Sequence, residues 1–156
     1  MSILLGNGDR TFQPQVTYVA GVNPFYLIVS DFNADGKPDL AVADAFGATI
    51  DILLGNGDGT FQPQVTYAVG SHPKSIAEGY FNGDGIPDLA VANVNSNNMS
   101  VLLGNGNGTF KTQVTYAVGT TPEAVAVADL NGNGNVDVVV GNNGTATASV
   151  FLNLLN

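Results

Sequence analysis

One stretch of 15 residues occurs three times at a fixed interval of 49 residues. It reads LLGNGDRTFQPQVTY from Leu4, LLGNGDGTFQPQVTY from Leu53 and LLGNGNGTFKTQVTY from Leu102. A fourth start, FLN, begins at Phe151, and no insertion or deletion disturbs the interval. A period of about 20 to 50 residues indicates a repeat architecture, in which each unit buries its apolar face against its neighbours. The chain is therefore restricted to folds built from stacked, similar units.

Each unit is predicted to contain four short strands. In the middle copy they are expected at 75–81, 88–93, 99–105 and 110–119, with Gly, Asn and Asp between them. No segment keeps a helical period for a dozen residues. Four strands in about 40 to 50 residues is typical of a β-propeller blade, so we expect an all-β fold of four-stranded antiparallel blades. A β-solenoid is the main competitor, although it normally has fewer turns in each repeat.

The order of strands at the two ends predicts a closure by strand exchange. Residues 1–20 read as a third and a fourth strand, 24–70 and 73–119 as complete blades, and 122–156 as a blade without its outer strand. Propellers use about 4 to 8 blades, and an open arc of three would expose apolar faces and a sheet edge. We expect a homodimer that closes a six-blade ring, with other ring sizes or a piece of a longer chain as alternatives.

Three loops in the same register carry oxygen-rich side chains. They read DFNADGKPD at 31–39, YFNGDGIPD at 80–88 and DLNGNGNVD at 129–137. Calcium takes about 6 to 8 oxygen ligands, and carboxylates, amides and one carbonyl at alternating positions can wrap it. The expected donors are Asp31, Asn33, Asp35, the Lys37 carbonyl and Asp39; Asn82, Asp84, the Ile86 carbonyl and Asp88; and Asp129, Asn131, Asn133, the Asn135 carbonyl and Asp137.

The first loop is expected to bind calcium best. The second loop has Tyr80 where the first has an acid, and the third has Asn133 where the first has Asp35. An EF-hand is excluded because the flanks read as strands and Val42 stands where its final Glu would be. Magnesium and zinc suit these donors less well, because magnesium keeps its waters and zinc prefers His and Cys. Alternatively, Asn, Asp and Gly serve here only as turn formers.

Composition excludes several partners. The 156 residues carry a formal charge of −9, with 4 Lys and Arg against 13 Asp and Glu. Such an acidic chain is a poor candidate for binding nucleic acid or an anionic membrane surface. It contains no cysteine, so no disulfide or thiolate site is possible, and no apolar run reaches the ~18 residues of a membrane span.

The motifs DFNADGKPDLAVA, YFNGDGIPDLAVAN and DLNGNGNVDVVVGN, together with SVLLGNGNGTF, resemble the FG-GAP/VCBS repeat, the blade unit of integrin-alpha-like β-propellers. The resemblance covers essentially the whole chain. It implies calcium binding at the nine-residue loops, a secreted or cell-surface location, and a role in adhesion, recognition or sugar binding. Tyr80 and Asn133 depart from the usual Asp. The resemblance also implies that the chain is a fragment, a small oligomer or an engineered set of blades.

Catalysis is not expected. His72 is the only histidine and lies in a loop before proline, and the carboxylates are better explained by calcium. The chain is therefore expected to be a scaffold or recognition module. A lectin-like module is the alternative, with Tyr18, Tyr67 and Tyr116 as sugar-stacking residues, although packing between blades explains these tyrosines better. Phe25 and Tyr26, which break the repeat, are expected to mark a contact surface.

Overall fold

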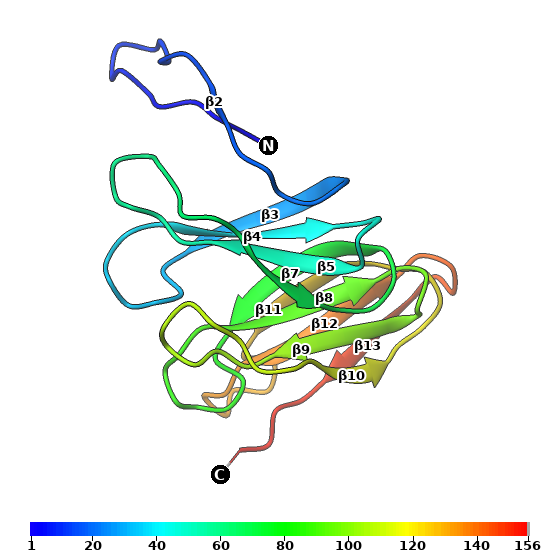
Figure 1. Ribbon diagram of the computed structural model, residues 1–156. Helices are drawn as coiled ribbons and strands as arrows, with labels where there is room; N and C mark the ends of the chain where they lie inside the picture. The colour runs from blue at the N-terminus through cyan, green and yellow to red at the C-terminus, as the bar shows by residue number, and fades with distance from the viewer. Residues whose placement is uncertain (156) are drawn as a thin grey trace.

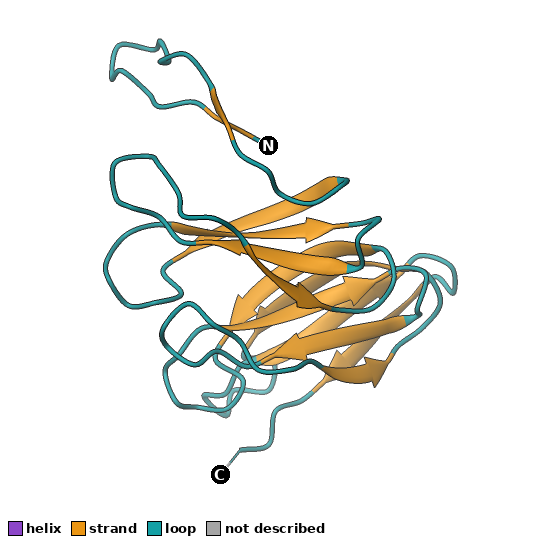
Figure 2. Cartoon of the chain, viewed as in Figure 1, coloured by secondary structure: helices purple, strands orange, loops and turns teal. Residues whose placement is uncertain are grey.

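The computed structural model describes residues 1–155, and all regular structure in that range is β-strand (Figures 1 and 2). The strands are β1 (Ser2–Ile3), β2 (Val16–Thr17), β3 (Pro24–Ser30), β4 (Asp39–Asp44), β5 (Thr49–Leu53), β6 (Val65–Ala68), β7 (Pro73–Gly79), β8 (Asp88–Asn93), β9 (Asn98–Leu102), β10 (Val114–Ala117), β11 (Pro122–Ala128), β12 (Asp137–Asn142) and β13 (Thr147–Phe151).

Strands pair with their neighbours along the chain, always antiparallel. The first sheet has the order β3-β4-β5-β6, the second β7-β8-β9-β10 and the third β11-β12-β13. The short strands β1 and β2 pair separately and form what we call the N-terminal arm, residues 1–20. A β-solenoid would instead pair equivalent strands of successive repeats. Pairing within each repeat therefore confirms the predicted antiparallel sheets and excludes the solenoid.

The second strand of each sheet is the most deeply buried. Every residue of β4 and β8 is buried, as expected for a strand whose apolar run continues without alternation. The fourth strands β6 and β10 are largely exposed and form sheet edges. The prediction for 88–93 matches β8, whereas the strand predicted at 110–119 is shorter, because Phe110 forms only an isolated bridge with Gly104.

Side-chain size alternates along the second strands and sets how the sheets stack. Ala41 and Ala43 of β4 pack in one cluster with Leu89 and Val91 of β8. The opposite face of β8 presents alanines, Ala90 and Ala92, which pack in a cluster that includes residues of β12. Large side chains of one sheet therefore meet small ones of the preceding sheet, as close packing requires.

The three sheets follow one another in chain order. β3 packs beside β7, and β7 beside β11, so the first strands of the sheets are neighbours. The N-terminal arm lies on the far side of the first sheet, while the C-terminus leaves the third sheet at the opposite end (Figure 1). Residues 1–155 contain no helix long and apolar enough to cross a membrane.

The first sheet buries an acidic group where the second has a hydroxyl. Asp51 of β5 is buried, and its Oδ1 accepts hydrogen bonds from Thr66 Oγ1 at 2.7 Å and Gln64 Nε2 at 3.3 Å, while its Oδ2 has no partner. The equivalent Ser100 accepts from Asn93 and donates to Gln113. Burial raises the pKa of the Asp51 carboxyl, opposed by the Thr66 hydrogen bond and assisted by the charge of Asp44.

Replacing Asp51 with serine should raise the free energy of unfolding at pH 7 by about 1 to 3 kcal/mol, because a charged, half-satisfied buried group is removed. The folded-state pKa lies above the unfolded value, so the ionisation of Asp51 costs stability only as pH rises through the folded pKa. The difference in the free energy of unfolding between Asp51→Ser and the wild type should therefore be smaller in acid. Urea unfolding of both proteins at pH 7 and pH 4 measures this difference. A variant that is less stable than the wild type at pH 7 would contradict this prediction.

Candidate metal-binding loops

The three nine-residue stretches all join the first strand of a sheet to the second. They connect β3 to β4, β7 to β8 and β11 to β12, and each ends on the first residue of the second strand. The repeat therefore places every candidate donor in the connection between the first and second strands of its sheet. Gly36, at the sixth position of the first loop, has φ +78° and makes the sharp turn there without a Cβ clash.

Side-chain oxygens fold the first loop onto its own backbone. Asp31 Oδ1 accepts from the Asp35 N–H at 3.2 Å and Oδ2 from the Gly36 N–H at 2.7 Å. Asn33 Oδ1 also accepts from Asp35 N–H, and Asp35 Oδ1 accepts from Lys37 N–H at 2.9 Å. The Asp and Asn residues thus act as turn formers in this structure. That role leaves lone pairs on each oxygen, since a carboxylate accepts about four hydrogen bonds or metal contacts.

The last acid of each loop has a second partner beyond the loop. Asp39 is fully buried, and its two oxygens accept from Phe32 N–H at 2.9 Å and Gly55 N–H at 2.7 Å. The same pattern recurs in the other repeats: Asp88 accepts from Phe81 and Gly104, and Asp137 from Leu130 and Asn153. In the first two sheets this carboxylate joins its loop to the start of the hairpin loop after the third strand, and in the third sheet it joins its loop to the segment after β13.

Electrostatics sets the first loop apart. Burial raises the pKa of the Asp39 carboxyl; the N–H groups of Gly55 and Phe32 oppose this, and the negative charges of Asp35 and Asp31 raise it further. The Asp39 carboxylate is therefore repelled by the other two acids of the loop, whereas at Asp35 the desolvation is outweighed by hydrogen bonds from Lys37 and Asn33 and by the charge of Lys37, which lower the pKa of Asp35. Lys37 Nζ lies 3.5 Å from Asp35 Oδ2 and offsets part of this charge. The sequence reading assigned Lys37 only a carbonyl role and missed this ion pair.

The second loop carries fewer acids. Burial raises the pKa of the Asp88 carboxyl, and the charge of Asp84 adds to this against the N–H groups of Gly104 and Phe81. Asn82 Nδ2 donates to Asp84 Oδ2 at 2.7 Å, and Ile86 N–H donates to Asp84 Oδ1 at 2.9 Å. Tyr80 is 44% exposed at the position where the first loop has Asp31.

The third loop is held largely by amide donors. The N–H of Gly134, together with those of Gly132 and Asn133, lowers the pKa of the exposed Asp129 carboxyl. Asn133 Nδ2 donates to the Asn153 carbonyl at 2.9 Å, and Asn135 Nδ2 donates to the Leu155 carbonyl at 2.8 Å. Asn131 Oδ1 accepts from Asn133 N–H. With both amide groups turned to the C-terminal segment, this loop is less free to rearrange around an ion.

The donor set of the first loop suits a hard cation by its chemistry. It offers three carboxylates, one amide oxygen and the Lys37 carbonyl, all of which are oxygen ligands of the kind that calcium takes. Within residues 1–155, however, no three Asp, Glu, His or Cys side chains stand close enough together to form a ready metal cluster. A bound ion would therefore require the first loop to contract, and its positive charge would offset the repulsion that Asp31 and Asp35 exert on Asp39.

The residues considered for sugar binding or catalysis mostly make packing contacts with other aromatic rings. Tyr18 lies edge-on to Phe61, and Tyr67 edge-on to Phe110, with ring centroids 5.5 and 5.6 Å apart. These contacts agree with the expected packing between sheets. His72 has φ +60° in a turn, and its ring lies 5.9 Å from that of Phe46.

Comparison with known proteins supplies the family. A family model described as FG-GAP-like repeat matches residues 31–91 and again residues 80–140. No sequence among the curated proteins matches the chain. The crystal structure of a functionally unknown protein from Desulfotomaculum acetoxidans is similar, with a TM-score of 0.63 and 16% sequence identity. That match covers 99% of this chain and 50% of the other, so the chain spans half the length of that structure, and the likeness concerns the fold alone.

Each matched range runs from one aspartate-rich loop, through one sheet, to the second strand of the next sheet. The two ranges together extend from residue 31 to residue 140 and so take in all three loops and most of the chain. The chain belongs to the FG-GAP-like repeat family.

Proposed function

We propose that this chain is a calcium-stabilised β-propeller module with a scaffold or recognition role in adhesion, acting outside the cell or at its surface. The observation that carries the proposal is the repulsion of the buried Asp39 carboxylate by Asp31 and Asp35 in a loop that also offers amide and carbonyl oxygens. The sheets would act as blades, and a second copy would complete the ring. Catalysis has no part in this proposal.

The propeller arrangement is supported by how the sheets stack. In a propeller the first strands line a central axis, and here β3, β7 and β11 are neighbours in that order. Alanines of one second strand meet larger side chains of the next in both sheet interfaces, leucine and valine in the first and valines in the second. This size complementarity lets the stacking continue in one direction, so further sheets could extend it to a ring. The third sheet contains three strands where the others contain four.

Calcium would be held in the first loop by Asp31, Asn33, Asp35, the Lys37 carbonyl and Asp39. It would supply positive charge that relieves the carboxylate repulsion, and its binding free energy would add to the stability of the fold. The corresponding donors of the second loop are Asn82, Asp84, Ile86 and Asp88, and those of the third are Asp129, Asn131, Asn133, Asn135 and Asp137. The first loop is expected to bind most tightly because it has the most carboxylates.

Thermal unfolding with and without calcium tests this role. At a calcium concentration about 100 times Kd, binding adds about 2.7 kcal/mol, which for a chain of this size raises Tm by roughly 5 to 10 °C. Asp35→Asn should abolish most of this rise. Asp58→Asn is the matched control, because it removes one negative charge from an exposed loop outside the nine-residue stretch. An equal rise in both variants, or none in the wild type, would refute a structural calcium site in the first loop.

Restoring an acid to the second loop should create a stronger site. Tyr80→Asp gives this loop the first donor of the first loop, and Tyr80 is exposed, with only a long 3.4 Å hydrogen bond to Glu78 to lose. We expect the calcium-dependent rise in Tm to be larger in Tyr80→Asp than in the wild type, whereas the Tm measured in chelator should change little. Tyr80→Asn controls for loss of the ring. An unchanged calcium response would show that the second loop lacks more than its first ligand.

A lectin-like role is the second candidate because two aromatic side chains are exposed at the start of β3. Phe25 is 52% exposed and Tyr26 is 44% exposed at the start of β3, and Lys74 Nζ lies 5.5 Å from the Phe25 ring centroid. Aromatic faces of this kind can stack on sugars. Screening a glycan array with the wild type and with Phe25→Ser separates the two roles: sugar binding that needs Phe25 supports a lectin, and its absence supports the scaffold.

A further inference from the structure

An aromatic contact recurs between successive repeats. The Phe110 ring, which precedes β10, packs edge-on against Phe32 and Tyr67 of the first sheet, with ring centroids 5.6 Å apart in each pair. One repeat earlier, Phe61 packs edge-on against Tyr18 of the N-terminal arm at 5.5 Å. Each of these phenylalanines thus reaches back to the repeat before it. Phe12, the next earlier member of the series, is 65% exposed.

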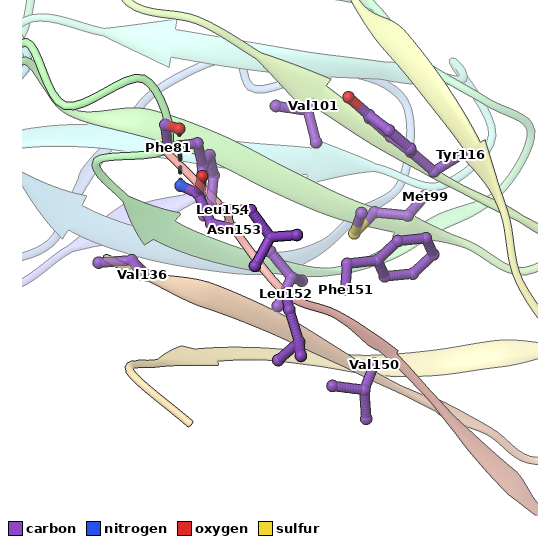
Figure 3. A pocket seen from close by; sticks show the side chains of 11 residues that line it. Phe81, Met99, Val101, Tyr116, Val136, Val150, Phe151, Leu152, Asn153 and Leu154 are labelled. Atoms are coloured by element: carbon purple, nitrogen blue, oxygen red, sulfur yellow. Dashed lines mark hydrogen bonds between the residues drawn. The ribbon is translucent and has the colours of Figure 1, made fainter. Parts of the chain in front are cut away.

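Near the C-terminal end of the chain, a cavity is lined by the residues equivalent to those that contact Phe110. Phe81 and Tyr116 stand 49 residues after Phe32 and Tyr67, and both line a cavity of about 470 Å³ between the second and third sheets (Figure 3). Met99, Val138 and Leu152 line it too. By the repeat, a phenylalanine of a fourth strand in the third sheet belongs in this space. At present Phe151 fills part of it, edge-on to Tyr116 at 5.7 Å.

The repeat predicts in which register a fourth strand would pair with β13, the edge strand beside this cavity. In the first sheet Thr66 pairs with Asp51, and in the second Thr115 pairs with Ser100. In the N-terminal arm Thr17 pairs with Ser2 in the same register. The equivalent residue of β13 is Ser149, whose strand has a neighbour, β12, on one side only. Strand β2 placed along β13 would therefore set Thr17 opposite Ser149 and bring Phe12 to the cavity.

The arm of the same chain lies too far away to do this. Met1, Ile3 and Tyr18 pack against the face of the first sheet that is opposite the second sheet, and the third sheet lies beyond the second (Figure 1). On that same face of the first sheet, Leu27 and Val29 of β3 are 45% and 58% exposed, so the arm covers β4 and β5 but leaves β3 uncovered. The third sheet of another copy would cover β3, and the arm beside it would complete that third sheet.

We propose that Phe12 of one copy fills the cavity beside Phe81 and Tyr116 of a second copy, while β2 pairs along β13. Strand β2 exchanges its two-residue pairing with β1 for the longer β13 edge, so little hydrogen bonding is lost. In a two-fold assembly the contact forms twice. This inference rests on the self-assembly proposed above and names the residues that carry it.

Engineered cysteines test the register directly, because the chain has no cysteine of its own. Thr17→Cys and Ser149→Cys are made as separate proteins, mixed and oxidised with diamide. We expect a disulfide-linked pair in the mixture and little in either protein alone. In a second experiment, light scattering at a series of protein concentrations gives the dimer Kd. Phe12→Ala should raise this Kd roughly thirtyfold. Phe46→Ala, also an exposed phenylalanine at 71%, is the matched control and should leave Kd unchanged.

The outcomes separate the two proposals. A dimer that forms without the cross-link and without dependence on Phe12 overturns this contact and leaves self-assembly standing. A wild-type protein that stays a monomer of 16.0 kDa at all concentrations overturns both, while the calcium response is judged independently.

Discussion

Replacing Asp88 with alanine should lower the free energy of unfolding by about 4 kcal/mol. The change leaves the buried N–H of Gly104 and the half-buried N–H of Phe81 without their acceptor, and each such loss costs about 1 to 3 kcal/mol. Water cannot easily replace the carboxylate, because Gly104 packs so tightly that an added Cβ would collide with the Pro87 carbonyl oxygen. Since domains are stable by only about 5 to 15 kcal/mol, Asp88→Ala should be close to unfolding at 37 °C.

Urea unfolding in the presence of chelator measures this effect apart from any metal. Asp84→Ala is the control, because Asp84 lies in the same loop but is exposed and accepts only from within it. We expect Asp84→Ala to cost less than about 1 kcal/mol. A similar cost for both variants in chelator would mean that the Asp88 carboxylate does not hold the loop to the hairpin.

Replacing Phe110 with alanine should cost about 3 to 5 kcal/mol, the usual range for truncating a buried phenylalanine. Phe110 is 7% exposed and lies in the core cluster shared by the first two sheets, where its ring contacts Phe32 and Tyr67. Its loss would open a cavity at that interface. The repeat supplies its own comparison, because Phe61 is only partly buried and pairs with one aromatic ring, that of Tyr18, while Phe12 is mostly exposed.

The three equivalent truncations should therefore form a graded series. Phe110→Ala should be the most destabilising, Phe61→Ala intermediate, and Phe12→Ala within about 0.5 kcal/mol of the wild type when the protein is dilute and monomeric. Denaturant midpoints at low protein concentration give the order. If Phe12→Ala were as damaging as Phe110→Ala under these conditions, the N-terminal arm would be part of the core of its own chain.

Local sequence was sufficient for the strands that are buried on both faces. The run Asp88–Asn93 is continuously apolar between its ends, and no exposed alternation competes with the assignment. Strand ends near sheet edges were harder to predict. Residues 1–20 were expected to form a third and a fourth strand but pair regularly only at Ser2–Ile3 and Val16–Thr17, because regular pairing ends where the hairpin widens around its Asn-Gly turn.

The candidate loops were located correctly, but the two-sided role of their last acid was not predicted. Asp39 accepts from Gly55, and Asp88 from Gly104, each 16 residues further along the chain. Nothing in a nine-residue motif indicates a partner at that distance. The repeat does contain a signal, because glycine stands 16 residues after this aspartate in two copies, as Gly55 and Gly104. A side chain at either position would collide with the carbonyl oxygen of the proline that precedes the aspartate.

Calcium binding by the first loop is tested most directly by isothermal titration of calcium chloride into metal-free protein. The proposed function predicts saturable binding of about one ion per chain, lost in Asp35→Asn and kept in Asp58→Asn. Wild-type protein that takes up no calcium at millimolar concentration, in a sample shown by circular dichroism to be folded, would contradict it.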